Sequence, residues 1–240
     1  MDNSDLKRLL QAVLSKDLLL DLEDAIKARA LSAHAMIRDY AELDARRARQ
    51  VEGRVRFPMQ ESSFQKICLE AGADELTATT VPGTDLKIFQ PFMRFSAPEQ
   101  QHGVILGFAA MPDPAELPPR NLSRAAAASL NYHLQPSLDL DGKGPKQGDV
   151  YVMLLAARDR EQAGAVREIG VGVVDSGYEE FLFYQDISLF LADYHAPEVE
   201  DAGAGNGNDG RPLTTLRAKP KEFRAPEKQL NDQDRENKKN

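Results

Sequence analysis

The stretch DVYVMLLA at residues 149–156 decides the fold, because it is apolar on both faces of an extended chain. A strand with one face in solvent alternates apolar and polar side chains, whereas a strand covered on both faces does not. This stretch therefore predicts a central strand with a packed layer on each side. The segments before and after it must supply those layers.

Further strands are predicted on both sides of this central one. Residues 168–174 form the next strand, and the turn Asp175-Ser176-Gly177 leads into a third at 178–184, followed by a short helix near 187–191. Upstream, strands are expected at 86–95 and 102–111, and a helix runs from about residue 121 to 134. The short loops at each strand pair indicate hairpins and hence an antiparallel sheet.

The fold class expected is therefore α+β. An N-terminal helical region precedes an antiparallel sheet of about five strands flanked by helices, in the order α-β-β-α-β-β-β-α. Ala125–Ala128 and the glycines at 170 and 172 are all small, which would allow this helix to pack closely on that strand. Alanine is also simply a good helix former, and this simpler account of the alanines is favoured.

Two amphipathic helices are expected before the sheet, one from about Ser4 and one that ends at Gly53, a residue suited to the position after a helix. An extended connector at 54–58 and a helix at 61–71 would follow. The second helix carries an apolar stripe that fits packing on the first helix, on the core or on a second copy of the chain. The stripe consists of Leu22, Ile26, Ala30, Ala33, Ile37, Tyr40 and Leu43.

Composition divides the chain into three segments: the N-terminal helices at 1–56, an α+β core domain at 57–195 and a tail at 196–240. Lys and Arg number 11 in the first, 10 in the second and 9 in the third, against 10, 19 and 9 Asp and Glu. The net charge of −8 is therefore concentrated in the core domain. The tail is rich in Gly and Asn and poor in apolar residues, so we expect it to be disordered.

The single cysteine, Cys68, excludes an internal disulfide and a cysteine-built zinc site. It shares a helical stripe with Phe64 and Ile67, which predicts a small buried side chain rather than a reactive thiol. The N-terminus lacks the pattern of a signal peptide and no segment is apolar enough to span a bilayer, so we expect a cytoplasmic protein without membrane contact. No motif predicts a cofactor or a metal ion.

Two segments have the composition of binding elements. Arg46, Arg47, Arg49, Arg54 and Arg56 form the densest basic patch, and Arg46 and Arg49 share a helix face that suits phosphate or an acidic partner. A solvated helix end, or pairing with the acidic core, is the alternative. In the tail, Leu213, Leu216 and Phe223 stand isolated among basic residues, as in segments that fold on a partner. An inert tail is equally compatible with this pattern.

The best catalytic hypothesis combines Asp85 with Asp141 and Lys143, as in a metal-dependent hydrolase or nuclease. An acidic core repels a polyanion unless metal ions or the basic segments compensate, so nucleic acid is not expected as a partner of the core. Asp175, Glu179 and Glu180 cluster at a hairpin tip, where solvated carboxylates are expected rather than acid–base catalysts.

These observations favour a non-enzymatic interaction or adaptor protein. A protein partner would bind through the N-terminal helices or the tail, and a homodimer is a second arrangement that the helices allow. The sheet order also suits a sensory module for a small ligand. A metal-dependent hydrolase or nuclease is the alternative function.

Overall fold

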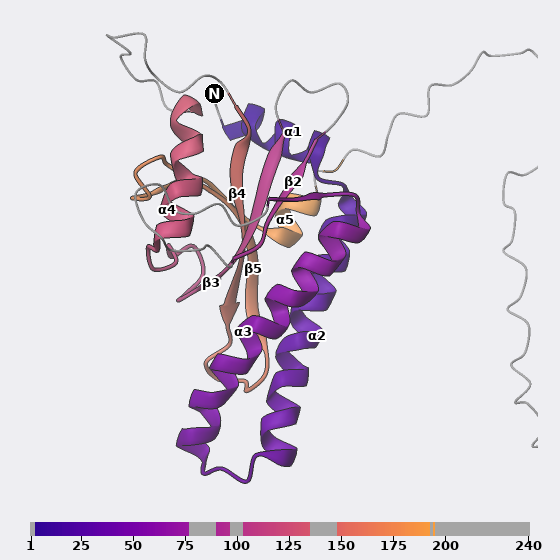
Figure 1. Cartoon of the computed structure of the whole chain (residues 1–240), viewed down its shortest axis with the longest axis vertical. Helices are drawn as coiled ribbons and strands as arrows, with labels where there is room; N and C mark the ends of the chain where they lie inside the picture. Colours follow the sequence, from indigo (N-terminus) through magenta and orange to yellow (C-terminus); the bar gives the residue numbers. More distant parts are fainter. Residues whose placement is uncertain (1–2, 77–89, 97–102, 135–147, 193, 195–240) are drawn as a thin grey trace, which may run out of the picture. The chain divides into compact units, whose positions relative to one another are not determined.

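The computed structural model of the chain describes residues 3–76, 90–96, 103–134, 148–192 and 194, all of which belong to one compact unit. This unit has an α+β fold in which helices precede and flank a single sheet (Figure 1). The predicted α+β fold class is confirmed, although the sheet has six strands rather than about five, with an additional strand before the two predicted ahead of the middle helix, and is mostly rather than wholly antiparallel. The tail predicted at 196–240 lies outside the described residues.

The sheet contains six strands, and each one pairs with its neighbours in the sequence. The strands are β1 (Asp74–Leu76), β2 (Phe92–Phe95), β3 (Val104–Met111), β4 (Val150–Arg158), β5 (Val166–Val174) and β6 (Phe181–Asp186). All pairs are antiparallel except β3 with β4, which run parallel from Val104↔Val150 to Met111↔Ala157. The helices α4 (Leu122–Ala128) and η1 (Ser129–Leu134) lie between these two strands, and such a crossover is what a parallel pair requires.

Strand β4 is buried from Val150 to Ala157, as its sequence predicts. Its side chains alternate between two cores, because successive residues of a strand point to opposite faces. Val150, Val152 and Leu154 join a core with the helices α1 (Asn3–Val13), α2 (Lys16–Tyr40), α3 (Ala45–Glu70) and α5 (Ile187–Ala192). Tyr151 and Met153 join the other core, which α4 covers. Both faces of the sheet are therefore packed.

Helices α2 and α3 lie side by side as a hairpin (Figure 1). Five residues of the predicted apolar stripe are buried within the chain, namely Leu22, Ile26, Ala30, Ala33 and Ile37. Gln60 of α3 donates to the carbonyl of Ile26 at 3.1 Å and ties the two helices together. The stripe ends there, because Tyr40 is 82% exposed.

The expected helix end at Gly53 and the connector at 54–58 are wrong. The chain turns after Tyr40 instead, and Asp44 caps the next helix by accepting from the backbone N–H groups of Arg46 and Arg47. Helix α3 then continues through Gly53 and Pro58, both of which face solvent. Helix α3 spans position 56, after which the predicted core domain begins. Residues of α1 and α2 before this position and residues after it share one core with the sheet.

The glycines at 170 and 172 of β5 accommodate side chains of the neighbouring strand rather than helix α4. A Cβ atom at Gly170 would lie 2.6 Å from the hydroxyl of Tyr184, and one at Gly172 would lie 2.7 Å from the ring of Phe181. Both rings come from β6, so the glycines make room for aromatic side chains of the next strand. Cys68 is buried as expected, and burial raises the pKa of its thiol to about 12.

Asn131 of η1 is fully buried between β4 and β5, beyond the last paired residues of these strands. Its amide nitrogen donates to the carbonyls of Tyr151 and Val174, both at 2.9 Å, and its oxygen accepts from the Tyr151 N–H at 2.8 Å. One side chain thus satisfies three buried backbone groups that the ladder leaves open.

Asn131→Leu should lower the free energy of unfolding by about 3 kcal/mol, because it leaves these backbone groups buried without partners. Urea denaturation measures the change. Asn131→Asp keeps the acceptor for the Tyr151 N–H but loses both donations, so it should also destabilise the protein. The exposed Asn121→Leu removes only a helix cap and should cost about 1 kcal/mol. Equal losses for Asn131→Leu and Asn121→Leu would contradict this role.

The turn between β5 and β6 is organised by Asp175, which is buried, whereas Glu179 and Glu180 are exposed. Its carboxylate accepts from the N–H groups of Gly177 at 3.0 Å, Glu179 at 2.5 Å and Glu180 at 3.0 Å. Burial raises the pKa of Asp175, but these backbone donors outweigh it, so the pKa lies below its ordinary value. The solvated carboxylate expected at this position is therefore wrong, since Asp175 is a structural acceptor.

Because the pKa of Asp175 is lower in the folded state, its carboxylate stabilises the folded protein. This contribution is complete at pH values above the pKa of Asp in the unfolded chain, about 4. This contribution is lost as the pH falls through the lower folded-state pKa. Asp175→Asn should therefore cost roughly 2 kcal/mol at neutral pH and less below pH 4. Thermal or urea unfolding at several pH values checks this. A cost that does not shrink in acid would contradict the carboxylate's role.

Candidate functional site

The structure describes only some of the predicted site residues. Asp85, Asp141 and Lys143 lie outside the described residues, as do Leu213, Leu216 and Phe223 of the tail. The five arginines at 46–56 all lie on α3. The hydrolase hypothesis and the tail contacts therefore stay predictions, and the arginines provide the starting point for a site.

The arginines of α3 divide into two groups. Arg46, Arg49 and Arg54 are exposed, and their side chains have no ion pair or hydrogen bond to any described residue. Arg47 instead pairs with Asp44, which caps the same helix, at 3.0 Å. Arg56 is half-buried and faces the sheet side of the helix. The predicted patch is thus partly free and partly engaged in the fold.

Glu52 lies between Arg49 and Arg56 on one face of α3 and is only 4% exposed. The Nδ1–H of His34 on α2 donates to its Oε2 at 3.0 Å. Arg158, the last residue of β4, places its Nη2 at 3.5 Å from Oε1, an ion pair without a hydrogen bond. Glu52 therefore joins both helices of the hairpin to the end of the central strand.

The charge of Arg56 is poorly compensated in this cluster. Burial lowers the pKa of Arg56, the neighbouring Arg158 lowers it further, and only Glu52 opposes these effects. Its buried Nη1 has no acceptor among the described residues. One carboxylate thus serves two guanidinium groups and an imidazole.

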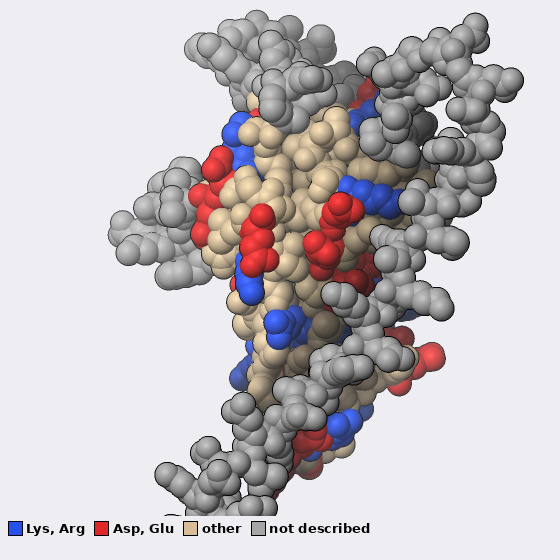
Figure 2. Space-filling model, turned by 90° about the vertical axis from the view of Figure 1, so that its right-hand side faces the viewer, with Lys and Arg blue, Asp and Glu red and all other residues tan. Residues whose placement is uncertain are grey.

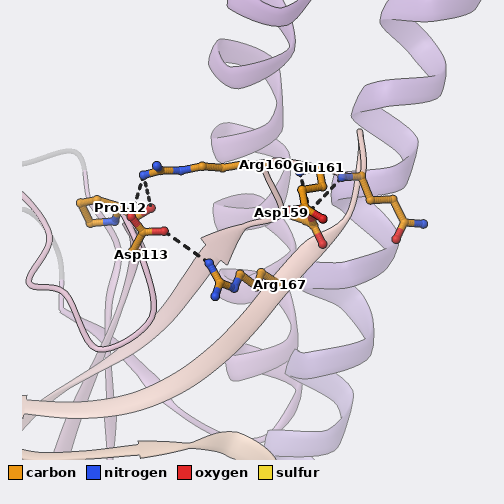
Figure 3. A network of polar contacts seen from close by, with 7 residues as sticks. Pro112, Asp113, Asp159, Arg160, Glu161 and Arg167 are labelled. Carbon is orange, nitrogen blue, oxygen red and sulfur yellow. Dashed lines mark hydrogen bonds and ion pairs between the residues drawn. The ribbon is translucent and has the colours of Figure 1, made fainter.

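Strands β3 and β4 run parallel, so their carboxyl ends reach the same edge of the sheet. Beyond β4, Asp159 accepts at 2.8 Å from the N–H groups of Glu161 and Gln162, and these two backbone hydrogen bonds lower its pKa. Arg160 reaches across to Asp113, which follows β3, at 2.7 Å. Figure 3 shows Arg167 of β5 directed at the same Asp113, at 3.6 Å.

A pocket of about 520 Å³ opens at this edge. We call it the arginine pocket; it is lined by Arg49, Met111, Pro112, Arg158, Arg160, Glu161 and Ala163. Its arginines come from α3, from the end of β4 and from the loop after β4. Its lining combines apolar side chains with three guanidinium groups, which suit an anionic ligand.

Sequence reasoning found Arg49 but missed Glu52, Arg158 and Arg160. Arg158-Asp159-Arg160 directly follows the most apolar strand of the chain, which places these charges at a sheet end. That position was the available signal. No such signal was present for Glu52, since a single glutamate in a basic helix is expected to be solvent-exposed.

Neither a group of metal-ligating side chains nor a membrane-spanning helix is found in the part of the chain that the structure describes. No three His, Cys, Asp or Glu side chains of residues 3–76, 90–96, 103–134, 148–192 and 194 are grouped to hold a metal ion. No helix in these ranges is long and apolar enough to cross a membrane. Comparison of the chain with protein-family models, with curated proteins and with solved structures found no match.

Glu52→Ala should lower the free energy of unfolding by roughly 3–5 kcal/mol, because it leaves buried guanidinium charge without its carboxylate. Urea denaturation measures the loss. Glu70→Ala removes an exposed carboxylate paired with Lys66 on the same helix and should cost less than about 1 kcal/mol. Similar losses in the two variants would show that Glu52 does not hold this cluster together.

Proposed function

We propose that the protein is a non-enzymatic interaction protein whose α3 helix binds an acidic segment of a partner protein. The observation that carries this proposal is the set of exposed arginines on α3, Arg46, Arg49 and Arg54, without acceptors among the described residues. We call these three residues the basic face. A guanidinium group offers five donors in a planar fork that matches a carboxylate.

The rest of the chain makes this face distinctive. The net charge is −8, so an acidic partner is repelled by most of the protein and attracted by a local basic surface. On the visible described surface in Figure 2, acidic and basic side chains are interspersed and form no large patch of one sign. The α2–α3 hairpin is held by its own core and by Glu52, so the basic face is presented on a rigid element.

The proposal includes a cytoplasmic location and a tail that contributes Leu213, Leu216 and Phe223 to partner binding. A homodimer is the second partner arrangement, and light scattering of the purified full chain distinguishes it from a monomer. A metal-dependent hydrolase remains the alternative function, with Asp85, Asp141 and Lys143 as its residues. Mg²⁺-dependent activity that is lost in Asp85→Ala and Asp141→Ala would favour that alternative.

The test is a quantitative pull-down from the native host with the full chain, followed by reconstitution with the purified partner. Arg46→Glu combined with Arg54→Glu should weaken partner binding by roughly tenfold or more, because it replaces attraction by repulsion. Both positions are exposed, and glutamate at position 46, in the first turn of α3, suits the helix dipole, so folding should be retained. Arg120→Glu changes an exposed charge elsewhere and should leave binding unchanged.

Partner binding that survives the double substitution would overturn the docking role of α3. Loss of the partner on deletion of residues 196–240 alone would move the binding site to the tail. Binding that weakens equally in Arg120→Glu would indicate a general charge effect rather than a basic face.

A further inference from the structure

We propose that the arginine pocket binds a small organic molecule through a phosphate or carboxylate group. This inference goes beyond the interaction function, because it rests on the pocket at the sheet edge and not on the basic face. It assigns a ligand class to residues that the sequence did not single out, Arg158 and Arg160.

The first argument is the local balance of charge. Asp113 is shared by Arg160 and Arg167, and Glu52 is shared by Arg158 and Arg56. The remaining charged residues of the pocket are Arg49, which has no acceptor among the described residues, and Glu161. Glu52 and Asp113 thus each face two guanidinium groups, and Asp159 interacts with Arg167, so five arginines face four carboxylates around the pocket. The surplus of one positive charge opens onto the pocket through Arg49. An anion placed there supplies the missing acceptor.

The second argument is preorganisation. Ligands of open sheets bind at the carboxyl ends of parallel strands, and β3 and β4 are the parallel pair of this sheet. The loop after β4 is fixed by the Asp159 turn and by Gly164, where a Cβ atom would lie 2.7 Å from Cβ of His34. The positive φ of Gly164 also favours glycine at this close approach. The arginines therefore come from elements that are already held in place.

The third argument is the size and lining of the pocket. A volume of about 520 Å³ falls within the range of small-molecule sites, roughly 300–1,000 Å³, and exceeds the need of a single inorganic anion. Met111, Pro112 and Ala163 provide an apolar wall for an uncharged body. Glu161 repels a second anionic group, so the ligand carries its anionic charge at one end. The side chain of Arg160 is 68% exposed, which leaves it free to turn from Asp113 to a ligand.

Calorimetric titration of the full chain tests this with three probes: phenyl phosphate, benzoate and uncharged phenol. We expect saturable binding of phenyl phosphate or benzoate, weakened by salt, and none of phenol. The anion that binds more tightly distinguishes a phosphate site from a carboxylate site. Arg160→Gln should weaken that binding about tenfold, whereas Arg120→Gln, an exposed charge outside the pocket, should leave it unchanged.

Glu161→Gln provides a readout that misfolding cannot imitate, since removal of a like charge should tighten binding severalfold. The absence of saturable binding by both anions would overturn the proposal. Equal affinities of the wild-type protein and the Arg160→Gln variant for the anion would also overturn it. The variant with Arg46→Glu and Arg54→Glu should retain anion binding, so failure of the basic face and failure of the pocket are distinguishable.

Discussion

The parallel pairing of β3 with β4 is the constraint on which the rest of the structure depends. A parallel pair must be joined by a crossover, and α4 with η1 forms it and covers one face of the sheet. The opposite face is covered by the N-terminal helices and α5. With both faces packed, β4 is apolar along almost its whole length, and the first charge after it, Arg158, emerges at the sheet edge. The same pairing places the end of β3 beside that charge.

At this edge of the sheet, two carboxylates each interact with more than one guanidinium group. Glu52 is buried and faces His34, Arg56 and Arg158, while Asp113 faces two exposed arginines. Burial of an ion pair is costly unless its partners are well arranged, and an unpaired buried charge is costlier still. Because removal of Glu52 would leave buried guanidinium groups unpaired, this one glutamate can hold the hairpin of α2 and α3 against the sheet. The guanidinium groups of Arg49 and Arg56 keep hydrogen-bonding capacity that no described residue uses.

The basic face and the arginine pocket are adjacent but separable. Arg49 belongs to both, because it is exposed on α3 and also lines the pocket. Arg54 belongs only to the basic face and Arg160 only to the pocket. The proposed partner protein and the proposed anion would therefore use different sets of residues, with one arginine in common. In both proposals the ligand is held by planar guanidinium groups; Arg46, Arg49 and Arg54 have no acceptor among the described residues, whereas Arg160 is paired with Asp113.

The sequence by itself determined which segments are buried. The unbroken apolar run of β4 predicted a strand covered on both faces, and the stripe from Leu22 to Ile37 predicted a packed helix face. It also located the basic patch on α3, because local charge density needs no knowledge of contacts. These properties depend on short-range patterns, which the chain carries in its order of residues.

Which residues contact one another follows from long-range packing and not from local sequence. Gly53 and Pro58 suggested a helix end, but the cap at Asp44 and packing along α3 override these local preferences. No local sequence pattern distinguishes Asn131 or Glu52. Asn131 binds the backbone of Tyr151, 20 positions away, and Glu52 pairs with Arg158 on another element. The arginine pocket likewise combines α3 with the ends of β3 and β4. Such long-range contacts follow from the pairing of strands, and no local sequence pattern states which strand ends will lie side by side.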